Sequence, residues 1–185
     1  MEIDINQAKI SIGDKYKVFI DGQQTHAASR QLFSFLPVVH LYALGDEQPR
    51  MTIAKKLSLL KAKYDITRWD NDRIEFRTIS FWKPQYQCQV GADTYMIYGH
   101  TGRKYSIFKN DVQIAWWDKA AVSWFAGDNY KIIADKDVDV DLVISLCLVI
   151  DNFSGDSHDG NLFTINLGNI GFQVRKFDPT WQPKY

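Results

Sequence analysis

The sequence predicts a mainly β protein: a closed barrel of about twelve antiparallel strands, built from six hairpins around one central hydrophobic helix. Three observations lead to this prediction. A hairpin-like phrase recurs along the chain, tight-turn residues separate runs of strand-forming residues, and one segment at residues 139–153 is apolar on every side. A repeat of fixed period is read first because it determines the architecture.

The recurring phrase consists of a serine with bulky apolar neighbours, a short spacer, then Tyr or His, any residue, and a β-forming residue. Successive copies begin roughly 22 to 24 residues apart. One double gap holds a weaker copy at residues 101–107. The clearer copies span residues 11–18, 34–42, 58–66, 80–88 and 123–132.

Strand-forming runs alternate with turn signals along the first two thirds of the chain. The runs are rich in Tyr, Ile, Val, Phe and Trp, which suit a half-buried pleated surface. Closing so long a meander removes its exposed edges, which favours a barrel over an open sheet. The runs span residues 16–20, 38–44, 64–69, 95–98 and 112–117, and the turn signals are Asp21-Gly22, Gly45-Asp46, Asn71-Asp72, Gly91-Ala92 and Asn110-Asp111.

The segment at 139–153 is predicted to be a helix that fills the barrel. Either Asp139 or Asp141 can cap its start, and its apolar residues cover all faces, which is typical of a helix surrounded by protein or lipid. An interfacial or membrane segment is the alternative to a buried core helix. Its apolar run, residues 142–150, is much shorter than the roughly 20 residues of a membrane span. A wide barrel needs such a filling element, since side chains alone fill only small barrels.

These elements divide the chain into a barrel domain at residues 1–153 and a C-terminal extension at 154–185. The extension is expected to form a loop, a hairpin around Gly168-Asn169 and an extended tail, all packed on the barrel.

The composition, 45% apolar and 24% charged, is ordinary for a globular domain. Lys+Arg and Asp+Glu are both 22, so no nucleic-acid partner is expected, because such binders are usually strongly basic. Cys88 and Cys147 are expected to be buried free thiols. The first residues contain no secretory leader, which predicts a cytoplasmic protein and leaves peripheral membrane attachment open.

The order and spacing of the phrases, the run Val-Gln-Ile-Ala-Trp-Trp at 112–117 and the apolar helix at 141–151 resemble the LURP-one-related family over about residues 5–153. That family is grouped with tubby-like C-terminal domains and phospholipid scramblases. The resemblance implies a twelve-stranded barrel around a hydrophobic helix and, through tubby domains, a phosphoinositide headgroup site made of basic residues. The chain lacks the cysteine-rich stretch and the long apolar end of scramblases, so lipid scrambling is not expected. It also continues about thirty residues past the helix, where relatives commonly stop.

One segment, residues 50–64, carries cations without any acid. If Ile53 and Leu57 point inward, strand alternation turns Lys56 outward. By the same argument Tyr64 and Phe76 face inward and their neighbours face out. The candidate headgroup site that results consists of Lys56, Lys61 at the hairpin tip, Lys63 and Arg77.

Two other interpretations stay open at this stage. The basic segment could be an ordinary solvated face that Asp65, Asp72 and Glu75 neutralise. The chain could instead be a protein-interaction or self-assembling scaffold, in which the C-terminal extension packs on a partner or on another copy. The residues of the extension suited to such packing are Phe172, Trp181 and Tyr185.

No motif in the sequence points to catalysis, a cofactor or a metal, so an enzyme is not expected. The four histidines lack ligand spacing, and His40 is expected to pack in the core. Residues 156–161 resemble a calcium loop only in composition. Ser58-x-x-Lys61 and Ser80-x-x-Lys83 match a nucleophile spacing but belong to the structural repeat. Catalytic groups need only meet in space, so an enzyme is not excluded.

Overall fold

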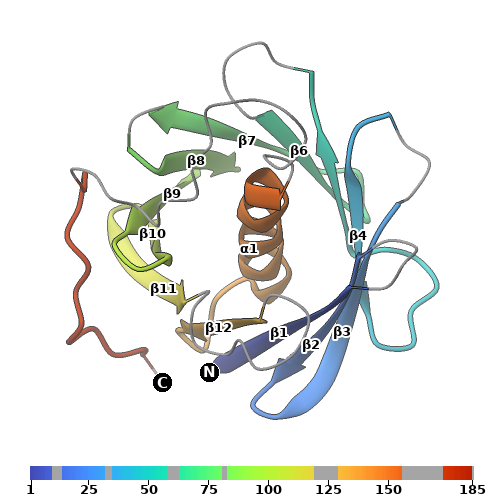
Figure 1. Cartoon of the computed structure of the whole chain (residues 1–185), viewed down its shortest axis with the longest axis horizontal. Helices are drawn as coiled ribbons and strands as arrows, with labels where there is room; N and C mark the ends of the chain where they lie inside the picture. Colours follow the sequence, from blue (N-terminus) through green and yellow to red (C-terminus); the bar gives the residue numbers. More distant parts are fainter. Residues whose placement is uncertain are drawn as a thin grey trace.

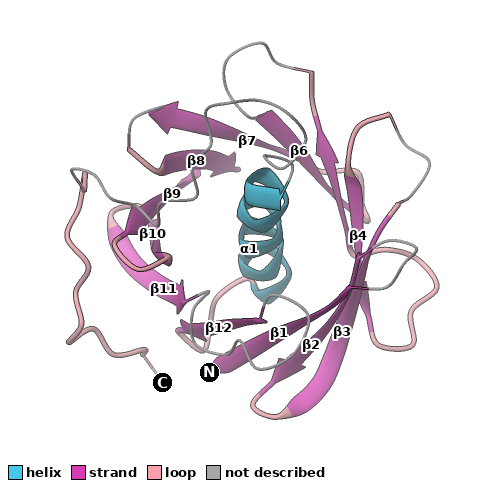
Figure 2. Ribbon diagram, in the orientation of Figure 1, coloured by secondary structure: helices cyan, strands magenta, loops and turns pink. Residues whose placement is uncertain are grey.

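In the computed structural model, twelve strands form a closed antiparallel barrel around one helix, which confirms the predicted fold class (Figures 1 and 2). The structure describes residues 1–9, 14–31, 35–57, 63–80, 83–118, 129–155 and 173–184. Each strand pairs with its neighbours in the chain, and β1 pairs with β12 to close the ring. The elements are β1 (Glu2–Lys9), β2 (Asp14–Ile20), β3 (Gln23–Arg30), β4 (Val38–Ala43), β5 (Met51–Lys55), β6 (Lys63–Arg68), β7 (Arg73–Ser80), β8 (Gln85–Val90), β9 (Asp93–His100), β10 (Lys104–Lys109), β11 (Val112–Asp118), β12 (Asn129–Ala134) and α1 (Val140–Gly155).

All five predicted turn signals fall between strands. Several of their residues have the positive φ that tight hairpin turns require, including Asp21 at 47°, Asn71 at 68° and Asn110 at 47°. Asn and Asp tolerate this conformation better than other residues with a side chain, because their short polar groups bond locally. The turns therefore form where the sequence indicates.

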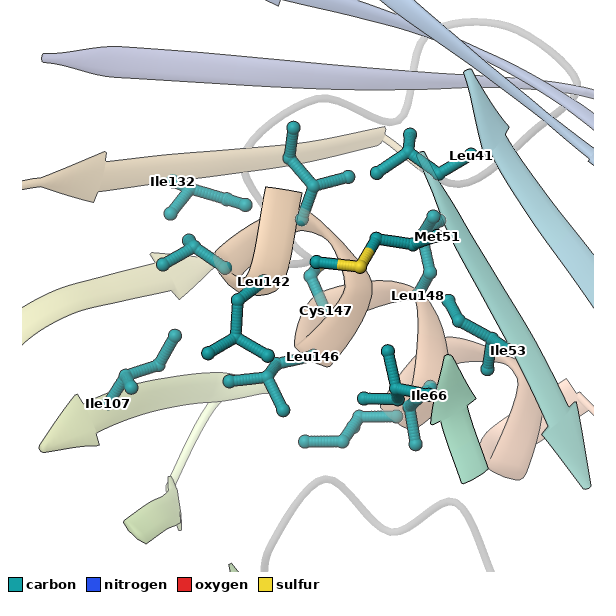
Figure 3. Close-up of a cluster of buried hydrophobic side chains, with 14 of the residues drawn as sticks. Leu41, Met51, Ile53, Ile66, Ile107, Ile132, Leu142, Leu146, Cys147 and Leu148 are labelled. Atoms are coloured by element: carbon teal, nitrogen blue, oxygen red, sulfur yellow. The ribbon is translucent and has the colours of Figure 1, made fainter. Parts of the chain in front are cut away.

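Helix α1 lies inside the ring of strands and fills the lumen, as predicted (Figure 1). The residues from Leu142 to Val149 have no exposed surface. Figure 3 shows its side chains meeting strand side chains on opposite sides of the helix. The strand residues labelled there are Leu41, Met51, Ile53, Ile66, Ile107 and Ile132. No helix in the described part of the chain is long and apolar enough to cross a membrane.

Two aspartates fix the ends of α1. Of the two candidate caps it is Asp139 that caps the helix, since its Oδ1 accepts the Leu142 amide at 3.0 Å. Its other oxygen accepts from Arg68 of β6 at 2.5 Å. In the last turns the buried carboxylate of Asp151 accepts phenol hydrogen bonds from Tyr16 of β2, at 3.0 Å, and from Tyr130 of β12. Because β2 and β12 flank β1, Asp151 joins the helix to both sides of the closing strand.

Three details of the core test the sequence analysis. Cys88 and Cys147 are buried and free, which confirms that expectation. The expectation for His40 was wrong: Val39 and Leu41 take the inward positions of β4, and half-buried His40 bonds Thr52 from the outer face. Leu57 was expected inward but lies beyond the end of β5 with 77% of its surface exposed.

The tail at residues 173–184, here called the strap, packs on the outer face of β9 to β11 (Figure 1). The Phe177 ring lies 5.4 Å from His100 and 5.3 Å from Trp116 between ring centroids. The Arg175 guanidinium lies 3.8 Å above Phe108. At its far end the Lys184 amide donates to Asp135 at 2.6 Å. The predicted hairpin around Gly168-Asn169 lies outside the described residues.

The strap explains why outward positions of β9 and β10 are buried. Ile97 and Ile107 face the lumen, so Tyr98, His100 and Phe108 face outward, yet each is less than a tenth exposed. They form a second small hydrophobic layer outside the barrel wall. Within this layer a hydrogen bond of 2.9 Å joins the Nε2 atom of His100 and the hydroxyl oxygen of Ser106.

The helix position makes a direct stability prediction. Leu146→Asp places an unpaired charge in the lumen and should lower the free energy of unfolding by roughly 3 to 5 kcal/mol, measured by chemical denaturation. Leu146→Met keeps the volume and should cost less than about 1.5 kcal/mol. Val112→Asp, at a position half exposed, should change stability little. A Leu146→Asp protein as stable as the parent contradicts the lumen position.

The strap should weaken in mild acid through His100. Burial lowers the pKa of His100 below its usual 6.5, and hydrogen bonds from the imidazole to the Arg175 backbone and the Gln173 side chain oppose this effect. Lys104 pairs with His100 across β9 and β10, so a second cation adjoins it. A lowered pKa means that the folded protein, with the strap packed on His100, favours the neutral imidazole. The contribution of His100 to the free energy of unfolding is therefore fully present above pH 6.5 and is lost as the pH falls below that value.

Calorimetric unfolding between pH 7.5 and pH 5 tests this. The parent should lose more stability over that range than His100→Gln, whose side chain cannot be protonated. Equal pH dependence in the parent and in His100→Gln would show that His100 does not control the strap.

Candidate functional site

The barrel has two chemically different ends. Because every strand pairs antiparallel with its chain neighbours, successive connections alternate between the ends. The turns that follow the even-numbered strands lie at one end with the start of α1. The even-numbered strands begin at the other end, where the last turn of α1 lies.

Cations prevail where the even-numbered strands begin, and we call this the basic end. The described acids there are Asp65, which lies 3.2 Å from Lys56, Asp118, which lies 3.8 Å from Lys104, and Asp151, which is buried among tyrosines. The described cations at this end are Lys15, Arg30, Lys55, Lys56, Lys63, Arg77, Lys83, Arg103 and Lys104.

Acids prevail at the opposite, acidic end. They occupy the tight turns and the helix start: Glu2, Asp21, Asp46, Glu47, Asp70, Asp72, Asp93, Asp111, Asp135, Asp137, Asp139 and Asp141. The described cations there are fewer: Arg50, Arg68, Arg73, Lys109, Lys136 and Lys184. The formal net charge of the chain is zero, yet the charges of the residues that the structure describes are polarised along the barrel axis.

Three of the four predicted site residues lie side by side at the basic end. Lys63 pairs with Arg77 across β6 and β7, and the Lys56 amide donates to the Lys63 carbonyl at 2.9 Å just beyond β5. Tyr64 and Phe76, the neighbours of Lys63 and Arg77 in their strands, are buried in the lumen, so Lys63 and Arg77 face outward. Lys56 lies on the same face, because it contacts Asp65, two residues along β6 from Lys63. We call Lys56, Lys63 and Arg77 the basic row. Lys61 lies outside the described residues.

The partners of the basic row leave much of its charge available. Lys56 lies 3.2 Å from Asp65, a carboxylate that also pairs with Arg73 at 2.5 Å. Lys63 forms no ion pair with any residue that the structure describes. Arg77 donates to the neutral Gln87 amide oxygen at 2.7 Å. Of the acids expected to neutralise this face, Asp65 does so in part.

The other two acids do not pair with the row. Asp72 lies 3.7 Å from Arg68 at the acidic end. Glu75 pairs with Asp65 across β6 and β7, one outward rung further from the basic end. A face with three adjacent cations and one shared carboxylate can attract an anion such as a phosphate. Its use for that purpose stays a prediction.

A separate cavity of about 430 Å³ opens at the acidic end. The turn from Gly45 to Arg50 and the indole of Trp69 line it. Asp46 is already paired with Arg50 at 2.7 Å. The cavity contains no pair of groups in a nucleophile and base arrangement, and it lies at the end opposite to the basic row.

The described residues assemble no metal-binding cluster that the sequence analysis overlooked. No group of three or more His, Cys, Asp or Glu among them is placed to hold a metal ion. His26 pairs with Asp141 at 3.0 Å, and His100 lies beneath the strap. His158, the segment 156–161 and the Ser58-x-x-Lys61 spacing lie outside the described residues.

The fold and the sequence agree with a known family. Residues 1–151, which include the whole barrel and most of α1, match the LURP-one-related family. The chain belongs to the LURP-one-related family. No curated protein and no solved structure matches the chain significantly. The LURP-one-related match ends before the strap, so the strap is an addition to the region that the family defines.

Sequence reasoning missed one feature of the basic end of this LURP-one-related barrel. Phe35 and Leu57, two apolar residues beside the row, are exposed at 93% and 77%. The repeat suggested that the apolar residues of each phrase belong to the core. The signal available in the sequence was their position next to the ends of the strand runs, where side chains leave the packed lumen.

Proposed function

We propose that this chain is a non-enzymatic module that binds anionic phospholipid headgroups at a membrane surface through Lys56, Lys63 and Arg77. The observation that carries the proposal is the basic row, three adjacent cations at the end of the barrel with few acids. The resemblance to tubby-like domains supports a phosphoinositide as the preferred headgroup.

The expected strength follows from the charges. Each cation near an anionic membrane contributes about 1 kcal/mol, so the row gives a weak and salt-sensitive attachment. Arg77 presents a planar fork suited to two phosphate oxygens, while the lysines act as point charges. The acidic end is repelled by the same surface, so binding also orients the barrel.

Co-sedimentation with vesicles tests the proposal. The parent should bind phosphoinositide-containing vesicles at low salt, release them at high salt and ignore neutral phosphatidylcholine vesicles. Lys56→Glu/Lys63→Glu should weaken binding at least about thirtyfold, the equivalent of two lost cations. Lys17→Glu/Lys136→Glu makes the same change in net charge at exposed positions outside the row and should bind nearly as well as the parent.

Two results would contradict the proposal. Undiminished binding by Lys56→Glu/Lys63→Glu would remove the basic row as the site. No binding of the parent at low salt would remove the lipid function, and a protein partner of the C-terminal extension would become the leading hypothesis. Of the three residues suggested for that role, Trp181 lies in the strap, while Phe172 and Tyr185 lie outside the described residues.

Asp65 should act as an internal competitor of the ligand. Asp65→Asn removes the carboxylate that contacts Lys56, so anionic vesicles should bind about fivefold more tightly in the same assay. Asp137→Asn makes the same charge change at the acidic end and should have little effect. Equal gains from both substitutions would mean that overall charge, and not the row, determines binding.

A further inference from the structure

Two large apolar side chains are exposed beside the basic row. Phe35 precedes β4 and Leu57 follows β5, with exposed fractions of 93% and 77%. Among the described residues these are the two most exposed large hydrophobic side chains. Single exposed apolar residues are common, so their relation to each other and to the row decides whether they matter.

The register places both residues on one edge. The pairing of Val38 with Ala54 continues through a hydrogen bond of 3.0 Å from the Lys55 amide to the Pro37 carbonyl. Phe35 lies two residues before Pro37, and Leu57 lies two residues after Lys55. They therefore lie next to neighbouring strand ends at the basic end of the barrel. Leu57 directly follows Lys56, the first member of the basic row.

Exposed apolar residues beside cations suit the boundary between lipid headgroups and acyl chains. Cations bind the headgroup phosphates, and apolar side chains next to them enter the layer just below. The acidic end also exposes apolar residues, namely Leu44, Trp69 and Val112. There, however, acids of the same turns lie within a few residues of each of them in the chain, and an anionic surface repels that end.

We propose that the barrel docks end-on to an anionic bilayer, with its basic end toward the membrane and with Phe35 and Leu57 inserted below the headgroups. This inference rests on the proposed function and adds a second component to it. The basic row supplies attraction that salt weakens, and the inserted pair supplies attraction that salt does not weaken. Recognition then requires a bilayer, and a soluble anion such as inorganic phosphate engages only the row.

Matched variants separate the two components in the vesicle assay. Phe35→Ser/Leu57→Ser should reduce binding to phosphoinositide-containing vesicles about tenfold or more and leave the slope of binding against salt concentration unchanged. Lys56→Glu/Lys63→Glu should reduce that slope. Leu44→Ser/Val112→Ser removes exposed apolar surface at the acidic end and should bind like the parent. The four apolar side chains replaced by serine are at least half exposed in the parent, so these variants should fold normally. Thermal unfolding of each variant, compared with that of the parent, checks this.

A fluorescent probe at position 57 reports insertion directly. Both native thiols are buried, and burial raises the pKa of Cys88 to about 12, so an introduced surface cysteine is labelled selectively. Leu57→Cys carrying the environment-sensitive dye NBD should shift its emission to the blue on anionic vesicles and be quenched by lipids brominated near the headgroup. Leu44→Cys with the same dye should keep its aqueous emission.

The outcomes distinguish this inference from the proposed function. Co-sedimentation without a blue shift at position 57, or unchanged binding by Phe35→Ser/Leu57→Ser, would overturn insertion and leave the headgroup site standing. A blue shift at position 44 would overturn the docking direction. Failure of the parent to bind any anionic vesicle at low salt would overturn both proposals together.

Discussion

The whole fold depends on one constraint: a helix that is apolar on every side must be enclosed. Helix α1 has no polar face to turn toward water, and among the elements that the structure describes it alone fills the lumen of the twelve-stranded ring. Each therefore stabilises the other, and neither is expected to persist alone. Asp139 and Asp151 make this mutual dependence specific, because they bind the helix to Arg68 at one end of the barrel and to Tyr16 and Tyr130 at the other.

Strand number, turn position and the helix could be predicted because each depends on local chemistry. Individual faces could not, and β4 shows why. The repeat aligns His40 with Tyr16 and Tyr64, but β4 is shifted by one residue relative to its phrase, so Val39 and Leu41 face the lumen. A shift of one residue exchanges every inward position for an outward one, and a repeat of period about 23 is too coarse to detect it.

The basic row could be predicted because Tyr64 and Phe76 obey alternation on two paired strands. The strap could not, for a different reason. Tyr98 and Phe108 are apolar on the outer face, where alternation predicts polar residues, and the sequence does not say which distant segment covers them. The prediction that Leu57 faces inward was wrong because it extended strand alternation past the last residue of β5. Beyond that residue the strand no longer determines the direction of a side chain.

Turn stereochemistry accounts for part of the charge polarity. The tight turns at the acidic end need residues that accept positive φ, and Asp21, Asn71 and Asp111 supply it. Some acids at that end are thus required by the fold whatever the function, so the acidic end is weak evidence for an oriented ligand. No such requirement places Lys56, Lys63 and Arg77 in one row, or leaves Phe35 and Leu57 exposed beside them. The proposal of membrane binding therefore depends on these five residues more than on the overall polarity.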